Sequence, residues 1–168
     1  MAKILMIVAP EGFRDEECFE PKKVFEQNEA EVAIASKGVK EAKGKLGKSI
    51  KVDLDISEVE VADYDAVVFV GGPGAAEYFD DANALDIAKD AFEQGKVVAA
   101  ICIAPSILAN AGILAGKSAT SYPSEKENLK AKGSVYTGEP VTVDGRIVTA
   151  NGPAAAKDFG KMVLDALE

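Results

Sequence analysis

Short, continuous apolar runs alternate along the sequence with stretches of helical periodicity, and this alternation restricts the possible fold more than any other feature. A short apolar run that ends at glycine or proline is typical of a strand buried on both faces. We expect strands at residues 3–9, 31–36, 65–70 and 97–101, a shorter alternating strand at 49–54, and helices at residues 16–28 and 82–94, from Pro105 onward, and from near Pro153. Strands joined by helices predict an α/β fold, with a mainly parallel sheet and helices on both of its faces.

The remaining segments complete this plan without a second domain. Residues 141–148 surround the pair Asp144-Gly145, which favours a type I′ turn and therefore predicts an antiparallel hairpin. Residues 37–51 carry several lysines between glycines, which we interpret as a solvated loop. No repeat, low-complexity tract or linker interrupts the chain, so we expect a single domain over residues 1–168.

Cys102 stands where a predicted strand meets a predicted helix. The apolar run 97–101 leads directly into it, and Pro105, a residue suited to a first helical turn, follows shortly after. A sharp turn from strand to helix forms a nucleophile elbow, which lifts one side chain into a cleft. The nearby helix N-terminus predicts a lowered pKa for this thiol. The alternative interpretation is an inert thiol, as in most buried cysteines.

The chain contains no histidine. This absence excludes Cys–His and Ser–His–Asp catalysis within the chain or between identical copies of it. A zinc site is also disfavoured, because two separated cysteines are the only soft ligands. A general acid or base must therefore be a carboxylate, tyrosine, lysine or cysteine. We expect neither a metal nor an organic cofactor.

The charge of the chain argues against two classes of partner. Lysine and arginine together number 19 and aspartate and glutamate 28, which gives a net charge of −9. Nucleic acid and anionic membranes attract basic surfaces, so we expect neither as a partner.

Residues 1–9 are too short for a signal peptide, and no segment has the length of a membrane span, which favours a cytoplasmic protein. Cys18 and Cys102 form no disulfide framework, and we interpret Cys18 as a packed helical thiol rather than a resolving cysteine.

Three loops leave the carboxyl ends of predicted strands, where ligands of parallel α/β sheets bind. They cover residues 10–17, 71–77 and 102–105, so an acidic loop and a glycine loop share the cleft of the elbow. The glycine loop lacks the spacing of the phosphate-binding motifs. Its backbone N–H groups can approach a ligand closely enough to stabilise an oxyanion, or its glycines form no more than a tight turn.

Two of these segments resemble the ThiJ/PfpI superfamily. They are Val68-Phe69-Val70-Gly71-Gly72-Pro73-Gly74 and Ala99-Ala100-Ile101-Cys102-Ile103-Ala104-Pro105, in the order and at the separation of that family. Further matches lie at Glu17 before Pro21 and at residues 3–9, 119–123 and 151–153, so the resemblance extends over nearly the whole chain. It implies a single-domain, flavodoxin-like three-layer sandwich with a nucleophile elbow.

The resemblance also implies roles for individual residues. Cys102 takes the place of the reactive thiol, and Glu17 that of a buried glutamate that hydrogen-bonds to the thiol and moves protons. The N–H groups near Gly71, Gly72 and Ile103 correspond to the oxyanion site of the family.

Two more residues match positions at the edge of the family's pocket. Tyr122 corresponds to a residue that lines the pocket. Glu77 corresponds to an acidic residue that, in the protease branch, reaches the site of the partner subunit. The resemblance therefore implies a homodimer.

The chain departs from the protease branch at Ile103, where that branch has histidine. A Cys–His–Glu relay cannot form, which disfavours an intracellular cysteine peptidase. The resemblance instead implies a cofactor-independent enzyme of the glyoxalase or deglycase type that acts on small reactive carbonyls such as methylglyoxal. A non-enzymatic redox sensor or chaperone-like stress protein with an oxidisable Cys102 is the alternative, and a hydratase or amidase-like relative is a third.

Overall fold

A seven-stranded sheet forms the centre of the protein in a computed structural model that describes all residues from Met1 to Glu168. Its spatial order is β11-β12-β8-β7-β1-β3-β6, and every neighbouring pair is parallel except β11 and β12. The strands are β1 (Lys3–Ile7), β3 (Glu31–Ser36), β6 (Leu54–Asp55), β7 (Ala66–Phe69), β8 (Val97–Ile101), β11 (Val141–Asp144) and β12 (Ile147–Ala150). The predicted α/β class, the parallel core and the 141–148 hairpin are thus confirmed.

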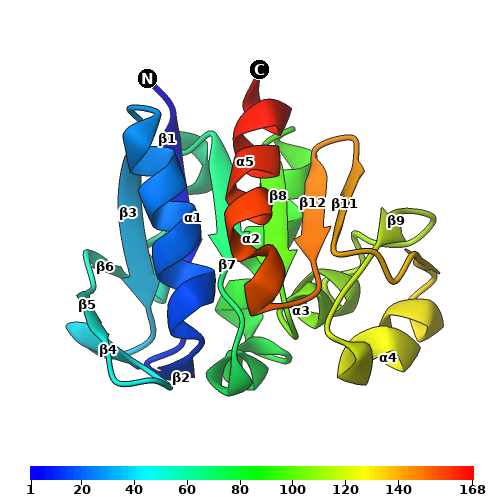
Figure 1. The fold of residues 1–168 in the computed structure, drawn as a ribbon, viewed down its shortest axis with the longest axis horizontal. Helices are drawn as coiled ribbons and strands as arrows, with labels where there is room; N and C mark the ends of the chain where they lie inside the picture. Colours follow the sequence, from blue (N-terminus) through cyan, green and yellow to red (C-terminus); the bar gives the residue numbers. More distant parts are fainter.

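Helices cover both faces of the sheet (Figure 1). α1 (Asp15–Gln27) and α5 (Ala156–Leu167) lie on one face, while α2 (Ala82–Glu93) and α3 (Pro105–Asn110) lie on the other. Each face buries its own apolar cluster, because successive side chains of the central strands point to opposite sides. α1 and α5 approach closely at Gly160, where an added Cβ would lie 3.0 Å from Cα of Pro21. No helix combines the length and the apolar character that crossing a membrane requires.

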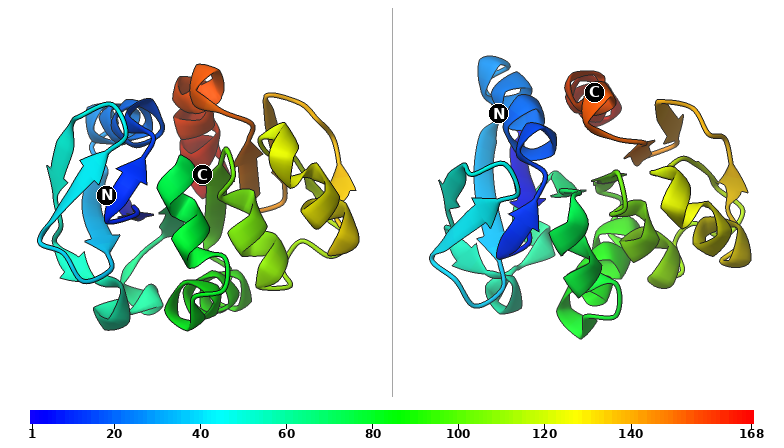
Figure 2. Two further views of the ribbon diagram at one scale, coloured as in Figure 1. Left: turned by 90° about the horizontal axis from the view of Figure 1, so that it is seen from below. Right: turned by 60° about the horizontal axis from the view of Figure 1, so that its bottom comes forward.

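The carboxyl ends of the parallel strands all lie at one end of the molecule, opposite both chain termini (Figure 1). Figure 2 shows this end directly, with short helices and loops surrounding the sheet. The short elements here are the 3₁₀ helices η1 (Ile56–Glu58), η3 (Pro73–Tyr78), η4 (Pro123–Glu125) and η5 (Pro153–Ala155), and α4 (Lys126–Ala131). A further 3₁₀ helix, η2 (Val61–Asp63), lies at the opposite end of the sheet, where the chain enters β7. The carboxyl end contains the three loops that the sequence placed around the elbow.

The lysine-rich segment 37–51 is more ordered than we predicted. It contains β4 (Glu41–Gly44) and β5 (Ser49–Lys51), which pair with each other and, through β4, with β2 (Glu11–Phe13). Asp15 fixes the turn between them, because its buried carboxylate accepts the N–H groups of Leu46 and Lys48 at 3.0 Å. The predicted strand at 49–54 corresponds to β5 and the start of β6, which are separated by Val52 and Asp53, whereas β4 lies in the part that we interpreted as a loop. A further two-stranded sheet joins β9 (Ser118–Ala119) and β10 (Val135–Tyr136).

The helical period of α2 places Leu85, Ala88 and Phe92 on one side, and the core accepts only the first two. Ala88 is buried and Leu85 packs against the core, but Phe92 is 39% exposed. The buried side chains of this helix are Ala84, Ile87, Ala88 and Ala91. Small alanines allow the helix to approach the sheet closely, and Phe92 instead lies near Nζ of Lys117, 5.9 Å from its ring centre.

Candidate active site

Cys102 sits at the predicted turn between β8 and α3 in a strained backbone conformation. Its φ angle is +65°, a left-handed value that residues with a side chain rarely adopt. Hydrogen bonds hold it there: its N–H donates to Ala150 O at 2.9 Å, and its carbonyl accepts the N–H of Tyr122 at 2.7 Å. The side chain is 9% exposed. The predicted nucleophile elbow is therefore present in the geometry of the chain.

Glu17 reaches the elbow from the first turn of α1. Its side chain is completely buried, and neither carboxyl oxygen has a hydrogen bond of regular geometry. The thiol of Cys102 lies close enough to interact with this carboxyl group and lowers its pKa. Gly71 packs beside both side chains, because a Cβ added there would overlap Oε1 of Glu17 and lie 2.6 Å from Cβ of Cys102. A glycine at position 71 thus allows Glu17 and Cys102 to approach each other.

The backbone N–H groups of Gly72 and Ile103 lie close enough to the sulfur of Cys102 to lower its pKa, so they favour a negative charge on the sulfur. Gly72 adopts φ +103°, and a Cβ there would overlap the backbone N of Arg14 and lie 2.8 Å from Gly12 O. Only glycine fits this turn, which aims the N–H group into the site. The two backbone donors that the sequence suggested thus lie within reach of the sulfur.

The thiol does not have the lowered pKa that we predicted from its position. Burial, followed by the charge of Glu17, raises the pKa of Cys102 to about 11, against the lowering by the Gly72 and Ile103 donors. The helix contributes little, since α3 begins only at Pro105 and has six residues. Burial also raises the pKa of Glu17 to about 8. The two groups therefore share protons as one buried pair at neutral pH.

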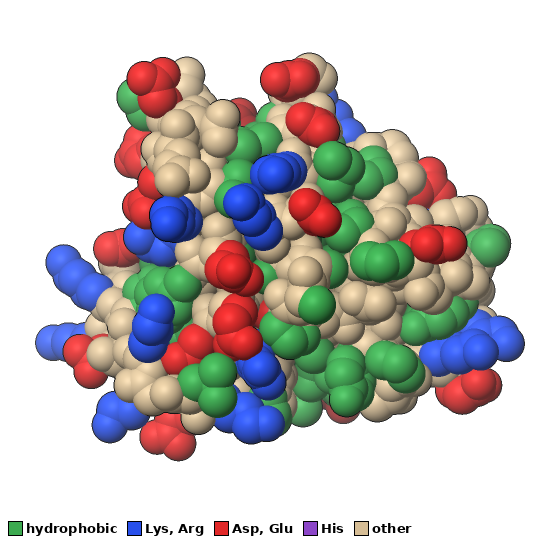
Figure 3. Space-filling view, viewed as in Figure 1, with side chains coloured by type: hydrophobic (Ala, Val, Ile, Leu, Met, Phe, Trp, Pro, Cys, Tyr) green, Lys and Arg blue, Asp and Glu red, His purple; other side chains and the backbone are tan.

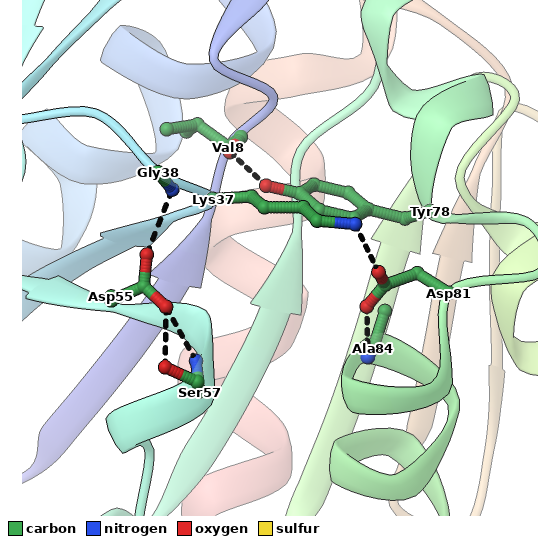
Figure 4. Close-up of polar contacts among 8 residues, drawn as sticks. All are labelled: Val8, Lys37, Gly38, Asp55, Ser57, Tyr78, Asp81 and Ala84. Carbon is green, nitrogen blue, oxygen red and sulfur yellow. Dashed lines mark hydrogen bonds and ion pairs between the residues drawn. The ribbon is translucent and has the colours of Figure 1, made fainter.

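A second set of contacts fixes η3, the short helix that follows the glycine loop (Figure 4). The buried hydroxyl of Tyr78 donates to Val8 O at 2.8 Å, which ties the end of η3 to the end of β1. Nζ of Lys37 lies 2.6 Å from Oδ1 of Asp81, and the other oxygen of Asp81 accepts the N–H of Ala84 at the start of α2. These contacts hold the carboxyl end of η3 and the start of α2, and so fix the segment that follows Gly72.

The two remaining predicted residues differ in their relation to the elbow. Tyr122 is joined to it through the backbone, and its side chain is 48% exposed at the edge of the site. Glu77 is exposed on η3, and its charge acts on Lys37 and Tyr78. No hydrogen bond or ion pair joins Glu77 to the Glu17–Cys102 pair within the single chain.

Arg14 is a residue of this site that we did not predict. Its N–H donates to Gly71 O at 2.9 Å, and its carbonyl accepts the N–H of Glu17 at 3.0 Å. The pKa of its guanidinium is raised first by Glu16 and also by the charges of Glu17 and Cys102. Its position three residues before Glu17, within the loop 10–17, is the sequence signal that could have identified it.

Cys18 is adjacent to Glu17 in sequence but belongs to the core. It is completely buried, and burial raises its pKa to about 12. Such a thiol is unreactive at neutral pH. The interpretation of Cys18 as a packed helical thiol is confirmed.

Comparisons with known proteins agree over the full length of the chain. The model of the DJ-1/PfpI family matches residues 2–166. An uncharacterized protein of Methanocaldococcus jannaschii is 45% identical over 170 residues, covering 99% of this chain and 83% of that protein. The protein named deglycase PfpI of Pyrococcus furiosus is 39% identical over 167 residues, covering 96% and 99% of the two chains. A crystal structure of a ThiJ/PfpI domain protein from Brachyspira murdochii superposes with a TM-score of 0.96 at 38% identity, covering 98% of this chain and 95% of that one.

Proposed function

This chain belongs to the DJ-1/PfpI family, and from that premise we propose that it is a cofactor-independent enzyme that converts small reactive carbonyls. Cys102 is the nucleophile and Glu17 carries the protons. Relatives that bear the name deglycase support an activity of this class. The observation that carries the proposal is the fully buried Glu17 beside a thiol whose sulfur receives two backbone N–H groups.

The surroundings of the pair decide where its first negative charge resides. A charge on the carboxyl group of Glu17 is buried without any regular hydrogen-bond donor. A charge on the sulfur of Cys102 is stabilised by the N–H groups of Gly72 and Ile103. Buried charges are stabilised mainly by such donors, and a Glu17 that keeps its proton would add a third one. The separate pKa values, about 8 for Glu17 and about 11 for Cys102, place most of the first charge on Glu17. The reactive form in our proposal is therefore the less populated one, a thiolate beside a protonated glutamic acid.

This form of the site suits the reaction of a 2-oxoaldehyde such as methylglyoxal. The thiolate attacks the aldehyde carbon, and the oxygen takes the proton of Glu17, which gives a hemithioacetal. The Glu17 carboxylate then removes the proton on that carbon, which gives an enediolate, and returns it to the neighbouring carbon. The hydroxyl proton of the first carbon passes to the oxygen of the neighbouring carbon, which gives a 2-hydroxy thioester. Water hydrolyses the thioester to lactate and frees the thiol. The N–H groups of Gly72 and Ile103 stabilise the oxyanions on this path.

The proposed enzyme works as a homodimer, without a nucleic-acid partner and in the cytoplasm. The exposed position of Glu77, away from the pair of its own chain, suits a residue that serves a partner subunit. Light scattering is the direct measurement. A particle of 17.6 kDa at micromolar concentration, the mass of one chain, would contradict the dimer.

A redox sensor is the second candidate function. The donors that surround the sulfur of Cys102 are suited to the oxygens of an oxidised sulfur as well as to an oxyanion. A peptidase is disfavoured, because the chain has no histidine to pair with the thiol.

One assay separates these functions. Lactate release from methylglyoxal is measured for the natural chain and for Cys102→Ala, with casein cleavage measured in parallel. The proposal expects lactate release that Cys102→Ala abolishes, and no cleavage of casein that depends on Cys102. Absence of turnover together with selective oxidation of Cys102 would favour the sensor. Casein cleavage that Cys102→Ala abolishes would show that Ile103 does not prevent peptidase chemistry.

A further inference from the structure

Arg14 is a cation built into the edge of the site. Its backbone is tied on one side to Gly71 and on the other to Glu17, the two residues that pack against Cys102. This places it at the carboxyl end of the sheet, immediately before the first turn of α1. The mechanism proposed above gives Arg14 no role.

The guanidinium of Arg14 holds a carboxylate in a forked geometry. Its Nε lies 3.0 Å from Oε1 of Glu16, and its second terminal nitrogen lies 2.9 Å from Oε2. Guanidinium groups recognise planar carboxylates through such paired bonds. Both side chains are partly exposed, at 31% and 35%, so solvent or a ligand can reach the pair. An exposed ion pair contributes little free energy, so a carboxylate of a ligand can replace that of Glu16 on Arg14 at little cost.

The positive charge of Arg14 interacts with the two reactive side chains, Glu17 and Cys102. Glu17 and Cys102 both stabilise the guanidinium, and Arg14 in turn lowers the pKa of Glu17. A cation within electrostatic reach of a nucleophile favours ligands that carry a negative charge beside the reacting atom. The chain has a net charge of −9, and acidic and basic side chains both lie on the face shown in Figure 3. A cation close to the site therefore favours an anionic ligand that the chain as a whole would repel.

We propose that Arg14 binds the carboxylate of the substrate in place of Glu16, and that the preferred substrates carry a carboxylate next to the reacting carbonyl. This inference rests on the carbonyl chemistry proposed above. The sulfur of Cys102 bonds to the carbonyl carbon, the π electrons move to the oxygen, and this oxygen takes the proton of Glu17. The neighbouring carboxylate then lies against Arg14, while the carboxylate of Glu16 turns to solvent.

The first experiment measures the charge preference of Cys102 without requiring turnover. Rate constants for alkylation at Cys102 by iodoacetate, an anion, and iodoacetamide, its neutral analogue, are determined by mass spectrometry at one pH. We expect Arg14→Met to lower the iodoacetate-to-iodoacetamide ratio about fivefold, as expected for the loss of one nearby unit charge. Arg14→Lys retains most of the ratio.

Arg146 provides the matched control. It is the other arginine of the chain and lines a hollow with Met1 and Lys96 at the opposite end of the sheet. Arg146→Met removes the same net charge and is expected to leave the ratio unchanged. An unchanged ratio in Arg14→Met, or an equal fall in Arg146→Met, overturns the inference. The iodoacetamide rate itself reports whether the elbow of each variant is intact.

The second experiment tests the class of substrate. Glyoxylate, an aldehyde that carries a carboxylate, and acetaldehyde, a neutral one, are compared as reversible protectors of Cys102 against iodoacetamide. Arg14→Met is expected to raise the protecting concentration of glyoxylate about fivefold and to leave that of acetaldehyde unchanged. Equal shifts for both aldehydes, or no shift, contradict the substrate class. If neither aldehyde protects the natural chain, the carbonyl proposal itself fails, and the iodoacetate ratio alone then decides whether Arg14 recognises anions.

Discussion

Glu17 lies against Cys102 with no regular hydrogen-bond donor on either of its carboxyl oxygens, although it is completely buried. A buried carboxyl group without donors retains its proton, and burial accordingly raises the pKa of Glu17 to about 8. The neighbouring sulfur has two backbone donors. We propose that this difference makes a form with the proton on Glu17 and the charge on Cys102 available for reaction, although the pKa of Cys102, about 11, lies above that of Glu17. The first prediction below tests this form directly.

Alkylation of Cys102 should follow two ionisations. We expect the rate with iodoacetamide to rise near pH 8, when the pair loses its first proton, and again near pH 11, when it loses the second. Glu17→Gln should give one step, at a pH below 11, because the charge of Glu17 is one of the causes that raise the pKa of Cys102. A rate that rises only near pH 11 in the natural chain would show that the first ionisation yields no reactive thiolate, which would contradict the proposed roles.

Glu17 should also make the stability of the protein depend on pH. Its pKa in the folded chain, about 8, lies above its value in the unfolded chain, about 4.3. The stabilisation is therefore complete below pH 4.3 and is lost as the pH rises towards 8, by about 1.4 kcal/mol per pH unit. Urea unfolding of the natural chain and of Glu17→Gln at pH 5, 6 and 7 measures this contribution. The difference in unfolding free energy should grow steadily in favour of Glu17→Gln, and a constant difference would show that Glu17 is ionised throughout.

Gly71→Ala should disrupt the site more than an alanine at another buried glycine. The new Cβ would overlap Glu17 Oε1 and Ile101 O and lie 2.6 Å from Cβ of Cys102. We expect a loss of about 1–3 kcal/mol in stability and slower alkylation of Cys102. Gly152→Ala is the control, since its Cβ would have no heavy atom within 4 Å and its backbone is extended. Equal effects of the two substitutions would mean that the approach of Glu17 and Cys102 does not depend on a glycine at position 71.

The sequence predicted the elements that carry strong local signals. The buried strands β3 and β8 lie at the predicted residues, because continuous apolar runs between polar turns have few alternative structures. The elbow at Cys102 was predictable from the strand and Pro105 that flank it. The hairpin β4–β5 was not, since its order depends on the distant carboxylate of Asp15 rather than on its own side chains.

The sequence was sufficient to predict which residues form the candidate site, but not the pKa values of those residues. The sequence placed Cys102, Glu17 and Gly72 in one cleft, and the structure brings these three together. It could not give the depth of burial, which raises the pKa of Cys102 where a helix N-terminus predicted a lower value. Arg14 was not predicted, because its proximity to the pair comes from a backbone hydrogen bond to Gly71, a residue far away in the sequence.

The strained backbone of Cys102 should cost stability that glycine recovers. Cys102 and Glu29 are the two residues other than glycine with positive φ, at +65° and +63°. We expect Cys102→Gly to be about 1 kcal/mol more stable than Cys102→Ala, because glycine adopts this conformation without a steric penalty. Glu29 is exposed, and Glu29→Gly should exceed Glu29→Ala by a similar amount without changing the alkylation of Cys102. Urea denaturation measures both pairs, and an alanine variant as stable as the glycine variant would show that the elbow is unstrained.

Mild peroxide should oxidise Cys102 to the sulfinate before it reaches other residues. The thiolate consumes two molecules of peroxide, gains two oxygen atoms and releases two molecules of water. The N–H groups of Gly72 and Ile103 and the proton of Glu17 can then hydrogen-bond to the new oxygens, so the product should persist rather than proceed to sulfonate. Cys18 should stay reduced, since it is completely buried and its pKa is about 12. Peptide mass analysis after graded peroxide compares the natural chain with Glu17→Leu, which removes the third donor and should yield more sulfonate. Equal oxidation of Cys18 and Cys102, or the same product in Glu17→Leu, would contradict the pairing of Glu17 with the thiol.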